Sequence, residues 1–547
     1  MKKILYIYSS NTNKVSLNNN DDIRLYCLNI GKLTGSNITS INDHKNLNKI
    51  ATDNVNIYSE FIFQKNSKFI ENNLIYKNKL SLYFLTDLSC KRSEMFDTYS
   101  NFCNALFIKD YLAKNHIDKV IFDGCNIDTV EAISSVLDKI DFRKKNIKDL
   151  SRNYKYNSFK NIIFFMKLAI ATFLNKALFP LKNLYKPSSV KELFLTRYPL
   201  HLDENLYEDK YTDLVDSDGV YLVNLFTDGL HQNLSLLSYL KAKRELSSNK
   251  KVKILDDYLS IKNILSSFIF SFIFINKLRP LIIKKYTLCG VDLTSNIKQE
   301  LYFSMLRVPR LLMWEQPLVK FLELTKVERA FYYLHEYSYG RMFTFFFKAL
   351  SPMTETIGFQ HGPSSLRKMV YMTASNELDI NGNGILSFPT PNKVLAEDEF
   401  SKKIYVASGY HNVKVMNKIY RLNYLDEIDR SKSLHNHFLI APGLHDGEFL
   451  MLALCNKIES NKNINYILKV HPRANNKYIE NFRHLKNLNI TNASITEVLS
   501  IVDKVYATYS SVAIEANYLG IDVEIIEIPG KINESPLIDK NFFQSAF

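Results

Sequence analysis

The chain has few of the residues that mark small disulfide-bonded or metal-bound folds. Its 547 residues include only six cysteines, which are scattered and form no C-x-x-C pair. This pattern argues against a disulfide framework and a zinc site, and it fits a reducing compartment. Glycine (16) and proline (14) are also scarce, whereas aromatic residues make up 13%. Disordered chains lack aromatics, so we expect a folded protein.

Several motifs of common enzyme classes are also missing. The sequence contains no P-loop, no G-x-G-x-x-G, no G-x-S-x-G and no H-E-x-x-H pattern. Their absence argues against P-loop ATPases, dehydrogenases, α/β-hydrolases and zinc metalloproteases. No metal-ligand pattern stands out, so we predict no metal site.

The charge balance is strongly basic. A net charge of +14 predicts an acidic partner, such as a phosphate, an anionic lipid or an acidic glycan. No Lys/Arg-rich tail or nucleic-acid-binding motif is present, so we do not expect a nucleic-acid partner. The N-terminal MKKILYIYSSN has an apolar run too short for a signal peptide. We therefore expect a first β-strand there and a cytoplasmic protein.

Strand-like and helix-like segments alternate along most of the chain, which predicts an α/β fold with parallel strands. We expect an N-terminal α/β accessory region over 1–150 and a basic amphipathic helical segment over 151–190. A Rossmann-like domain over 191–390 and a second one over 391–547 follow, separated by a proline-containing linker near residue 390.

Two apolar segments without acids interrupt this pattern, at 158–185 and 261–286. Their uninterrupted apolar runs are shorter than the roughly 20 residues that span a bilayer. Each segment fits either a buried interdomain helix or a basic amphipathic helix on an anionic membrane surface. The presence of two such segments in a basic chain favours peripheral membrane association.

Polar residues gather where two C-terminal strands end. The sequence NYILKVHPR places Lys469, His471, Pro472 and Arg473 at one strand end. A second strand ends in Ser510 and Ser511, where a helix carrying Glu515 begins. Carboxyl ends of parallel strands and helix N-termini favour anions, so these residues predict a phosphate or nucleotide site. Simple helix capping by the serines is the alternative.

The preceding domain offers candidates for a catalytic base. Glu336 follows an apolar strand, and Arg341 nearby would keep it ionised. A structural ion pair explains the same residues. Asp203 and Asp228 also follow strands, and His361 lies in a Gly-Pro turn that would present it outward.

The segment from Glu336 through Leu537 resembles bacterial surface-carbohydrate biosynthesis proteins with a GT-B glycosyltransferase fold. The matching pieces, in order, are His335-Glu336-Tyr337, GFQH at 358–361, 389–395, MNKIYRLNYL, LKVHPR, TYSSVAIEANYLG and GKINESPL. The His-Pro and Ser-Ser pairs are also similar to those of CMP-sugar-dependent sialyltransferases and polysialyltransferases. The chain likewise resembles Kdo transferases. The chain lacks a clear Asp-Asp-Gly or Glu-Asp-Gly motif, which leaves the base open.

This resemblance implies a fold of two Rossmann-like domains facing a cleft, and an inverting, metal-independent transfer from a CMP-sugar. His471, Ser510 and Ser511 would contact the donor phosphate. The sugar would be a sialic or other nonulosonic acid, or Kdo. The acceptor would be a glycan or lipid-linked saccharide of capsule or lipopolysaccharide. Two alternatives remain: a CDP-glycerol-type polyol-phosphate transferase, and a non-catalytic partner of the polysaccharide assembly machinery.

Overall fold

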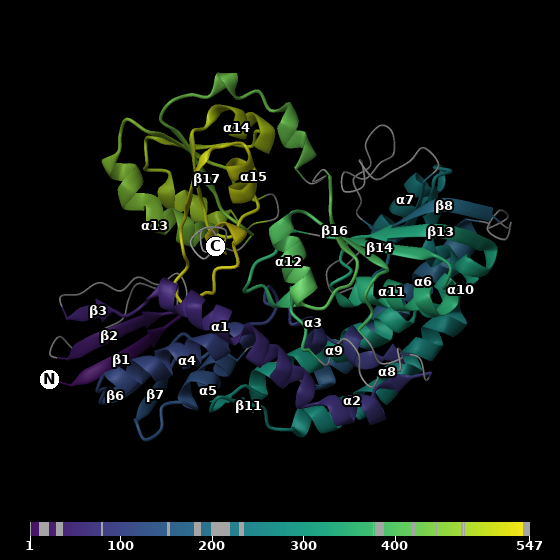
Figure 1. Cartoon of the computed structure of the whole chain (residues 1–547), viewed down its shortest axis with the longest axis horizontal. Coiled ribbons are helices and arrows are strands. Elements are labelled where there is room, and N and C mark those ends of the chain that lie inside the picture. The colour runs from purple at the N-terminus through teal and green to yellow at the C-terminus, as the bar shows by residue number, and fades with distance from the viewer. Residues whose placement is uncertain are drawn as a thin grey trace.

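The computed structural model places three helix-covered parallel sheets in three domains (Figure 1). The residues it describes are 2–9, 21–28, 37–77, 80–149, 154–179, 188–198, 219–228, 235–360, 362–375, 377, 388–417, 422–444, 446–471, 474 and 476–539. This arrangement confirms the predicted α/β class with parallel sheets.

The N-terminal domain contains five parallel strands in the order β3-β2-β1-β6-β7. The strands are β1 (Lys3–Tyr8), β2 (Asp22–Cys27), β3 (Ile38–Ser40), β6 (Lys119–Asp123) and β7 (Phe142–Lys145). Helices of this part are α1 (His44–Gln64), α2 (Ser67–Asn73), α3 (Asp87–Cys90), α4 (Thr98–Lys114) and α5 (Ile127–Ser134), and a short antiparallel pair is formed by β4 (Ile75–Tyr76) and β5 (Leu80–Ser81). The last four residues of β1 are all buried, as expected for a parallel strand covered on both faces.

The central domain contains a seven-stranded parallel sheet in the order β10-β9-β8-β13-β14-β15-β16. The strands are β8 (Ser188–Arg197), β9 (Val220–Asn224), β10 (Val252–Ile254), β13 (Thr325–Tyr332), β14 (Glu355–Phe359), β15 (Lys393–Ala396) and β16 (Val413–Val415). Its helices are α6 (Tyr154–Leu178), α7 (Leu236–Ser247), α8 (Ile261–Ile283), α9 (Thr294–Leu312), α10 (Glu315–Leu324), α11 (Ser338–Leu350) and α12 (Glu399–Ala407), and β11 (Thr287–Leu288) pairs with β12 (Val291–Asp292) between α8 and α9.

The C-terminal domain repeats the strand order of the N-terminal one, as β19-β18-β17-β20-β21. The strands are β17 (His437–Ala441), β18 (Asn465–Leu468), β19 (Leu488–Ile490), β20 (Lys504–Ala507) and β21 (Asp522–Ile525), and the helices are α13 (Gly447–Ser460), α14 (Ile495–Ile501) and α15 (Val512–Tyr518). In all three sheets the chain reverses its direction of travel beside the first strand. Such switch points leave a crevice at the carboxyl ends of the strands, where open α/β sheets bind ligands.

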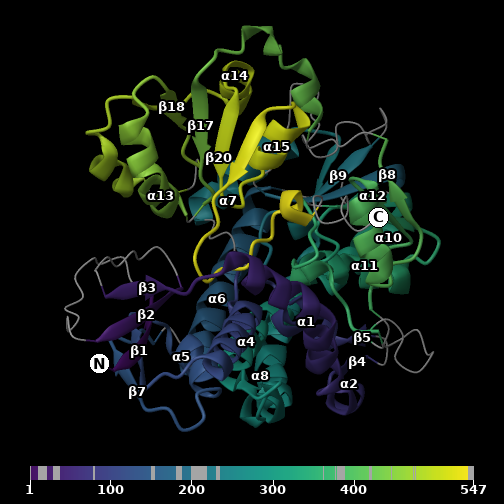
Figure 2. The same cartoon turned by 60° about the vertical axis from the view of Figure 1, so that its left-hand side comes forward.

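The three domains are not equally independent. One hydrophobic core runs through the N-terminal and central domains, with α9 packed among α3, α5, α6, α8 and α11. The C-terminal domain has separate cores on the two faces of its sheet. After β21 the chain leaves this domain and runs back between the other two (Figure 2). The molecule is therefore one large two-sheet body and one smaller domain joined to it.

Two predicted boundaries differ from the structure. The strand Lys393–Ala396 was expected in the last domain, but it pairs with β14 and belongs to the central sheet. The expected linker near residue 390 is packed instead: Phe388 is buried, and the Arg341 guanidinium lies 4.3 Å from the centre of its ring. The segment over 151–190 is likewise no separate unit, because α6 packs on α8 and α9. Proline marks tight packing here rather than a boundary.

Candidate functional site

Two neighbouring cavities lie between the domains, at the carboxyl ends of strands from the central and C-terminal sheets. The central cavity, of about 420 Å³, is lined by Arg92, Glu94, Arg197, Thr227, Asp228, Arg307, Leu334, Tyr337, Ser338, Tyr339, Gly362, Pro363, Lys368 and Glu534. The C-terminal cavity, of about 330 Å³, is lined by Ser93, Glu94, Asp97, Tyr99, Ser100, Gly443, Leu444, Asp446, Phe449, Tyr509, Ile528, Lys531, Ile532 and Glu534. Glu94 and Glu534 line both cavities, so the two form one interdomain cleft.

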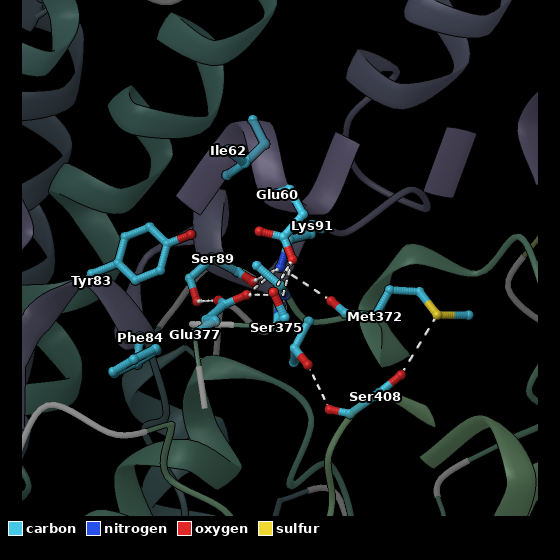
Figure 3. Close-up of polar contacts among 12 residues, drawn as sticks. Glu60, Ile62, Tyr83, Phe84, Ser89, Lys91, Met372, Ser375, Glu377 and Ser408 are labelled. Atoms are coloured by element: carbon cyan, nitrogen blue, oxygen red, sulfur yellow. Dashed lines mark hydrogen bonds and ion pairs between the residues drawn. The ribbon is translucent and has the colours of Figure 1, made fainter. Parts of the chain in front are cut away.

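A loop from the N-terminal part of the chain enters this cleft because Lys91 anchors it. Helix α3 ends at Cys90, and the backbone of its C-cap residue Lys91 is left-handed with φ +49°. The Lys91 ammonium is buried, and it lies 3.1 Å from both Glu377 Oε2 and the Met372 carbonyl of the central domain (Figure 3). The residues that follow, Arg92 and Glu94, thereby reach the cavity walls.

The segment after β21 also reaches the cleft. The Asn533 N–H donates to Asn48 Oδ1 of α1 at 2.9 Å, and the Asn533 carbonyl accepts from Arg367 Nε at 2.7 Å. Arg367 also forms a buried ion pair with Asp539 at 2.6 Å. These contacts fix the backbone on both sides of Glu534 and place that carboxylate between the cavities.

Four cationic side chains line the central cavity. Arg307, on α9, donates from Nε to both carboxylate oxygens of Asp87 of α3 at 3.0 and 3.1 Å, and its Nη1 donates to Asp228. Arg92 lies 4.6 Å from the centre of the Tyr337 ring. Lys368 is the third cation, and its ammonium donates to the Pro363 carbonyl at 3.2 Å.

Arg197 differs from these cations because its side chain makes no hydrogen bond or ion pair with the residues that the structure describes. It stands at the end of β8, beside the switch point of the central sheet. A guanidinium in this position is suited to bind a carboxylate or phosphate bidentately.

The two shared carboxylates have opposite pKa shifts. Burial raises the pKa of Glu534, and the negative charge of Glu94 adds to the effect, while Lys368 opposes it. Desolvation acts upward on Glu94 as well, but the Arg92 guanidinium, 2.8 Å away, a backbone hydrogen bond and the charge of Lys368 together lower the pKa of Glu94 below its usual value. Environments that separate the pKa values of neighbouring carboxyl groups are typical of acid–base sites.

Two tyrosine hydroxyls in the cleft have no hydrogen-bond partner among the described residues. They belong to Tyr339 in the central cavity and Tyr509 in the C-terminal cavity. Burial raises the pKa of both phenols far above the ordinary value, so they stay protonated. Each hydroxyl is a donor that a bound ligand oxygen would satisfy.

The turn after β13 shapes the wall of the central cavity. Leu334 has a left-handed backbone with φ +62°, which is strained for a leucine. Helix α11 starts close behind it, and a Cβ at Gly340 would lie 2.1 Å from the Leu334 carbonyl oxygen. Glycine at 340 therefore permits the sharp turn that brings Leu334, Tyr337 and Tyr339 to the cavity.

The structure places the predicted base Glu336 outside the cleft. Its side chain is fully buried, it accepts a hydrogen bond from the Tyr405 hydroxyl, and it lines neither cavity. Arg341, expected to hold it ionised, instead donates to the Phe84 carbonyl and Ser89 Oγ. Asp228 does line the cleft, paired with Arg307.

Four predicted site residues lie outside the described residues: Asp203, His361, Pro472 and Arg473.

The described residues of the predicted phosphate site sit at the correct sheet edge but beyond the cavity walls. Lys469 donates to the Ala493 carbonyl, and His471 lies three residues beyond the end of β18. Ser510 accepts from the Val512 N–H at 3.4 Å, while Ser511, the N-cap residue of α15, makes no side-chain capping hydrogen bond. Ser511 is exposed and Glu515 is buried on α15. Tyr509, immediately before Ser510, reaches the C-terminal cavity in their place.

Sequence reasoning missed the residues that both cavities share. Glu534 lies in GKINESPL, one of the segments that carry the resemblance to surface-carbohydrate biosynthesis proteins. Glu94 and Arg92 follow no strand, and they reach the cleft only through the Lys91 anchor. A signal existed for Arg197, because it is the last residue of the apolar strand β8.

Comparisons with known proteins find structural similarity only at low sequence identity. No protein-family model matches the chain, and no curated protein matches it. Among solved structures, UDP-N-acetylglucosamine 2-epimerase from Rickettsia bellii is 12% identical, with a TM-score of 0.34, over 63% of this chain and 81% of its own. The wall teichoic acid polymerase TagF is 13% identical, with a TM-score of 0.28, over 68% and 79%. Because these TM-scores are low, the fold is defined by the sheet topology described above.

Proposed function

We propose that the protein transfers a sugar from a nucleotide-activated donor to a hydroxyl acceptor. The observation that carries this proposal is the carboxylate pair, Glu94 and Glu534, between two cavities at the carboxyl ends of two parallel sheets. An interdomain cleft of this kind holds a donor on one side and an acceptor on the other, and the groups that react meet where the two cavities join.

The donor side is the C-terminal cavity. Its volume, about 330 Å³, falls within the range of small-molecule sites. Phe449 and Tyr509 offer aromatic surface to a base, and Lys531 offers positive charge to a phosphate. In line with the resemblance to CMP-sugar enzymes, the donor is a CMP-activated sialic acid, another nonulosonic acid or Kdo, and His471, Arg473, Ser510 and Ser511 extend the phosphate site.

The acceptor side is the central cavity, with Glu534 as the general base. A glutamate with a raised pKa accepts a proton at near-neutral pH better than an ordinary one. The acceptor hydroxyl gives its proton to Glu534 while its oxygen forms a bond to the anomeric carbon. The bond from that carbon to the phosphate oxygen breaks, and CMP leaves with the electron pair. Arg92 and Lys531 stabilise the charge on the departing phosphate, and no metal is assigned.

The ionised Glu94 completes the arrangement. Its negative charge near the anomeric carbon stabilises the positive character that a sugar ring develops in such a transition state. Arg197 binds an acidic group on the acceptor, which fits a glycan of capsule or lipopolysaccharide. The acceptor is free or lipid-linked.

Nucleotide binding tests the donor. Thermal unfolding should be measured with CMP, CMP-sialic acid, CDP-glycerol and UDP-N-acetylglucosamine, each at a concentration series. A ligand at 100 times its Kd stabilises by about 2.7 kcal/mol, so the melting temperature should rise with CMP ligands. A rise with UDP ligands alone would overturn the CMP assignment, and no rise with any nucleotide would overturn the proposal.

Product analysis separates the remaining classes. Release of CMP from CMP-sialic acid with transfer to a glycan supports the proposal, whereas consumption of CDP-glycerol would assign a polyol-phosphate transferase. Cells carrying His471→Ala or Glu534→Gln should lose the glycan. An unchanged glycan in both strains would favour a non-catalytic assembly partner.

A further inference from the structure

Helices α6 and α8 together expose a broad apolar face on the central domain. On α6 the exposed apolar residues repeat at helical spacing and therefore share one side: Phe159, Ile163, Met166, Ile170 and Phe173. On α8 the exposed apolar residues are Ile261, Leu265, Ile269, Phe272 and Ile273. The two helices pack against each other and both lie on α9. Their outer sides therefore form one surface, defined here as the α6–α8 face.

This exposure is unusual in degree. Phe159 and Met166 are each 61% exposed and Phe173 is 67% exposed, although all three are large apolar side chains. Contiguous exposed apolar patches mark sites that bind a protein or a membrane. Both helices are also long and apolar enough to cross a bilayer by composition, yet only a third of each apolar stretch is buried in the structure.

The charge around the face identifies what covers it. The stretches Phe159–Leu178 and Ile261–Ile283 contain no Asp or Glu. They carry three cations each: Lys160, Lys167 and Lys176 on α6, and Lys262, Lys277 and Arg279 on α8. Lys176, Lys262 and Arg279 are exposed. A second copy of the chain would bring like charges together on this face, whereas anionic lipid headgroups would neutralise them.

The packing of α6 on α9 favours helices that lie in the membrane surface over helices that span the bilayer. Asn161 of α6 accepts a hydrogen bond from Arg310 Nε of α9 at 2.9 Å, and the Arg310 guanidinium lies 4.1 Å from the centre of the Phe164 ring. Spanning a bilayer would tear this side of α6 away from α9. Lying in the membrane surface keeps these contacts and buries only the outer, apolar side.

We propose that the α6–α8 face seats the protein on an anionic phospholipid surface, with both helices lying flat in the headgroup region. The same arginine links this face to the cleft, because Arg310 Nη1 donates to the Asp228 carbonyl at 2.7 Å. A bound bilayer therefore lies one helix layer from the central cavity, where a lipid-linked acceptor would enter. The membrane contact itself does not depend on the identity of the donor.

Vesicle flotation tests this proposal with the full chain. Vesicles of phosphatidylcholine alone are compared with vesicles that also contain about 30% phosphatidylglycerol, which gives roughly the charge density of a natural anionic surface. The protein should float with the anionic vesicles and much less with the neutral ones. No flotation with anionic vesicles overturns the proposal.

Two triple variants test the face itself. Removing charge through Lys176→Gln, Lys262→Gln and Arg279→Gln should weaken partitioning about 100-fold, because each cation near the surface contributes roughly fivefold. Removing apolar contact through Phe159→Ser, Met166→Ser and Phe173→Ser should also abolish flotation. Unchanged flotation of either variant overturns the proposal.

Control variants remove exposed cations and exposed apolar side chains elsewhere on the surface. Lys414→Gln, Lys462→Gln and Lys486→Gln remove the same charge from exposed positions, and Met353→Ser, Val406→Ser and Leu452→Ser remove exposed apolar groups. Both controls should float like the parent. Light scattering adds a second readout: a dimer that the Phe159, Met166 and Phe173 changes dissociate would assign the face to a second copy and overturn the membrane proposal.

Discussion

At the residue scale, the cleft shifts the pKa values of two glutamates, Glu94 and Glu534, in opposite directions. Glu94 lies beside Arg92, which favours its ionised form, whereas Glu534 is desolvated and faces the charge of Glu94. The difference arises from neighbours rather than from the residues themselves. It also depends on segments far apart in the chain, since the two glutamates meet only in the folded protein.

The first prediction concerns the pH dependence of transfer. Because the base works when deprotonated and the pKa of Glu534 is raised, the acidic limb of kcat/KM should lie above the pH at which an ordinary glutamate titrates. Activity should fall as the pH drops through this raised pKa and level off above it. Glu534→Gln should lower kcat/KM by about 10²–10⁴-fold and remove this limb.

Glu524→Gln is the control for this variant. Glu524 belongs to the same domain but pairs with Lys457 and Lys504 at the far side of the sheet, outside both cavities. It should keep the parent profile. Retention of activity within twofold by Glu534→Gln would remove Glu534 from the base role.

At the element scale, the wall of the central cavity depends on how tightly α11 follows β13. Leu334 takes a left-handed conformation, and the first turn of α11 sits directly against its carbonyl. Packing this close requires a residue without a Cβ. The strain at Leu334 is located at the cavity, as expected where function fixes the backbone.

The second prediction tests this contact. Gly340→Ala should destabilise the protein by about 1–3 kcal/mol, because the new Cβ overlaps the Leu334 carbonyl and forces the turn to move. Urea unfolding measures the change, and nucleotide or acceptor binding reports displacement of the cavity wall. Gly362→Ala is the control: a Cβ there meets nothing within 4 Å, so stability should not change. Equal stability of Gly340→Ala and the parent would contradict the steric account.

Elements of this kind were well anticipated from sequence where the pattern is local. Strand β20 and the turn from it into α15 follow from an apolar run next to a polar one, although the strand ends at Ala507 rather than at the predicted Tyr509 and Ser510. Glu336 was expected at a strand end and does follow β13, but its side chain turns into the core toward Tyr405. Sequence gives the end of a strand, whereas the direction of a side chain after a strained turn depends on tertiary packing.

At the scale of the whole molecule, residues from three regions complete the cleft. The loop after α3, the ends of the central strands and the segment after β21 are distant in sequence, and buried polar contacts hold them together. No local pattern reports such contacts, which is why Arg92, Glu94 and Glu534 were not predicted. The prediction of a linker from the prolines near residue 390 was wrong for a related reason. Phe388 is buried, so this segment is packed against the central domain.

The third prediction concerns the segment after β21. Arg367→Ala should free residues 527–539, because it removes both the hydrogen bond to the Asn533 carbonyl and the ion pair with Asp539. Backbone amides of this segment should exchange faster with deuterium, and transfer activity should fall as Glu534 loses its position. Removing one partner of a buried pair is expected to cost about 3–5 kcal/mol.

Arg483→Ala is the matched control, since Arg483 pairs with Glu480 on the exposed surface and should contribute less than about 1 kcal/mol. Its exchange pattern and activity should equal those of the parent. Unchanged exchange over 527–539 in Arg367→Ala would show that this arginine does not hold the segment.

The return of the chain after β21 also sets an order of assembly. The N-terminal and central domains share one core and precede the C-terminal sheet in the chain, so they can fold while later residues are still being synthesised. Glu534 joins them only after β21 has paired and the chain has come back past Asn48. A nascent protein with two finished sheets therefore has a cleft without Glu534, and the transfer proposed above would require that the third domain has folded and the chain has returned to the cleft.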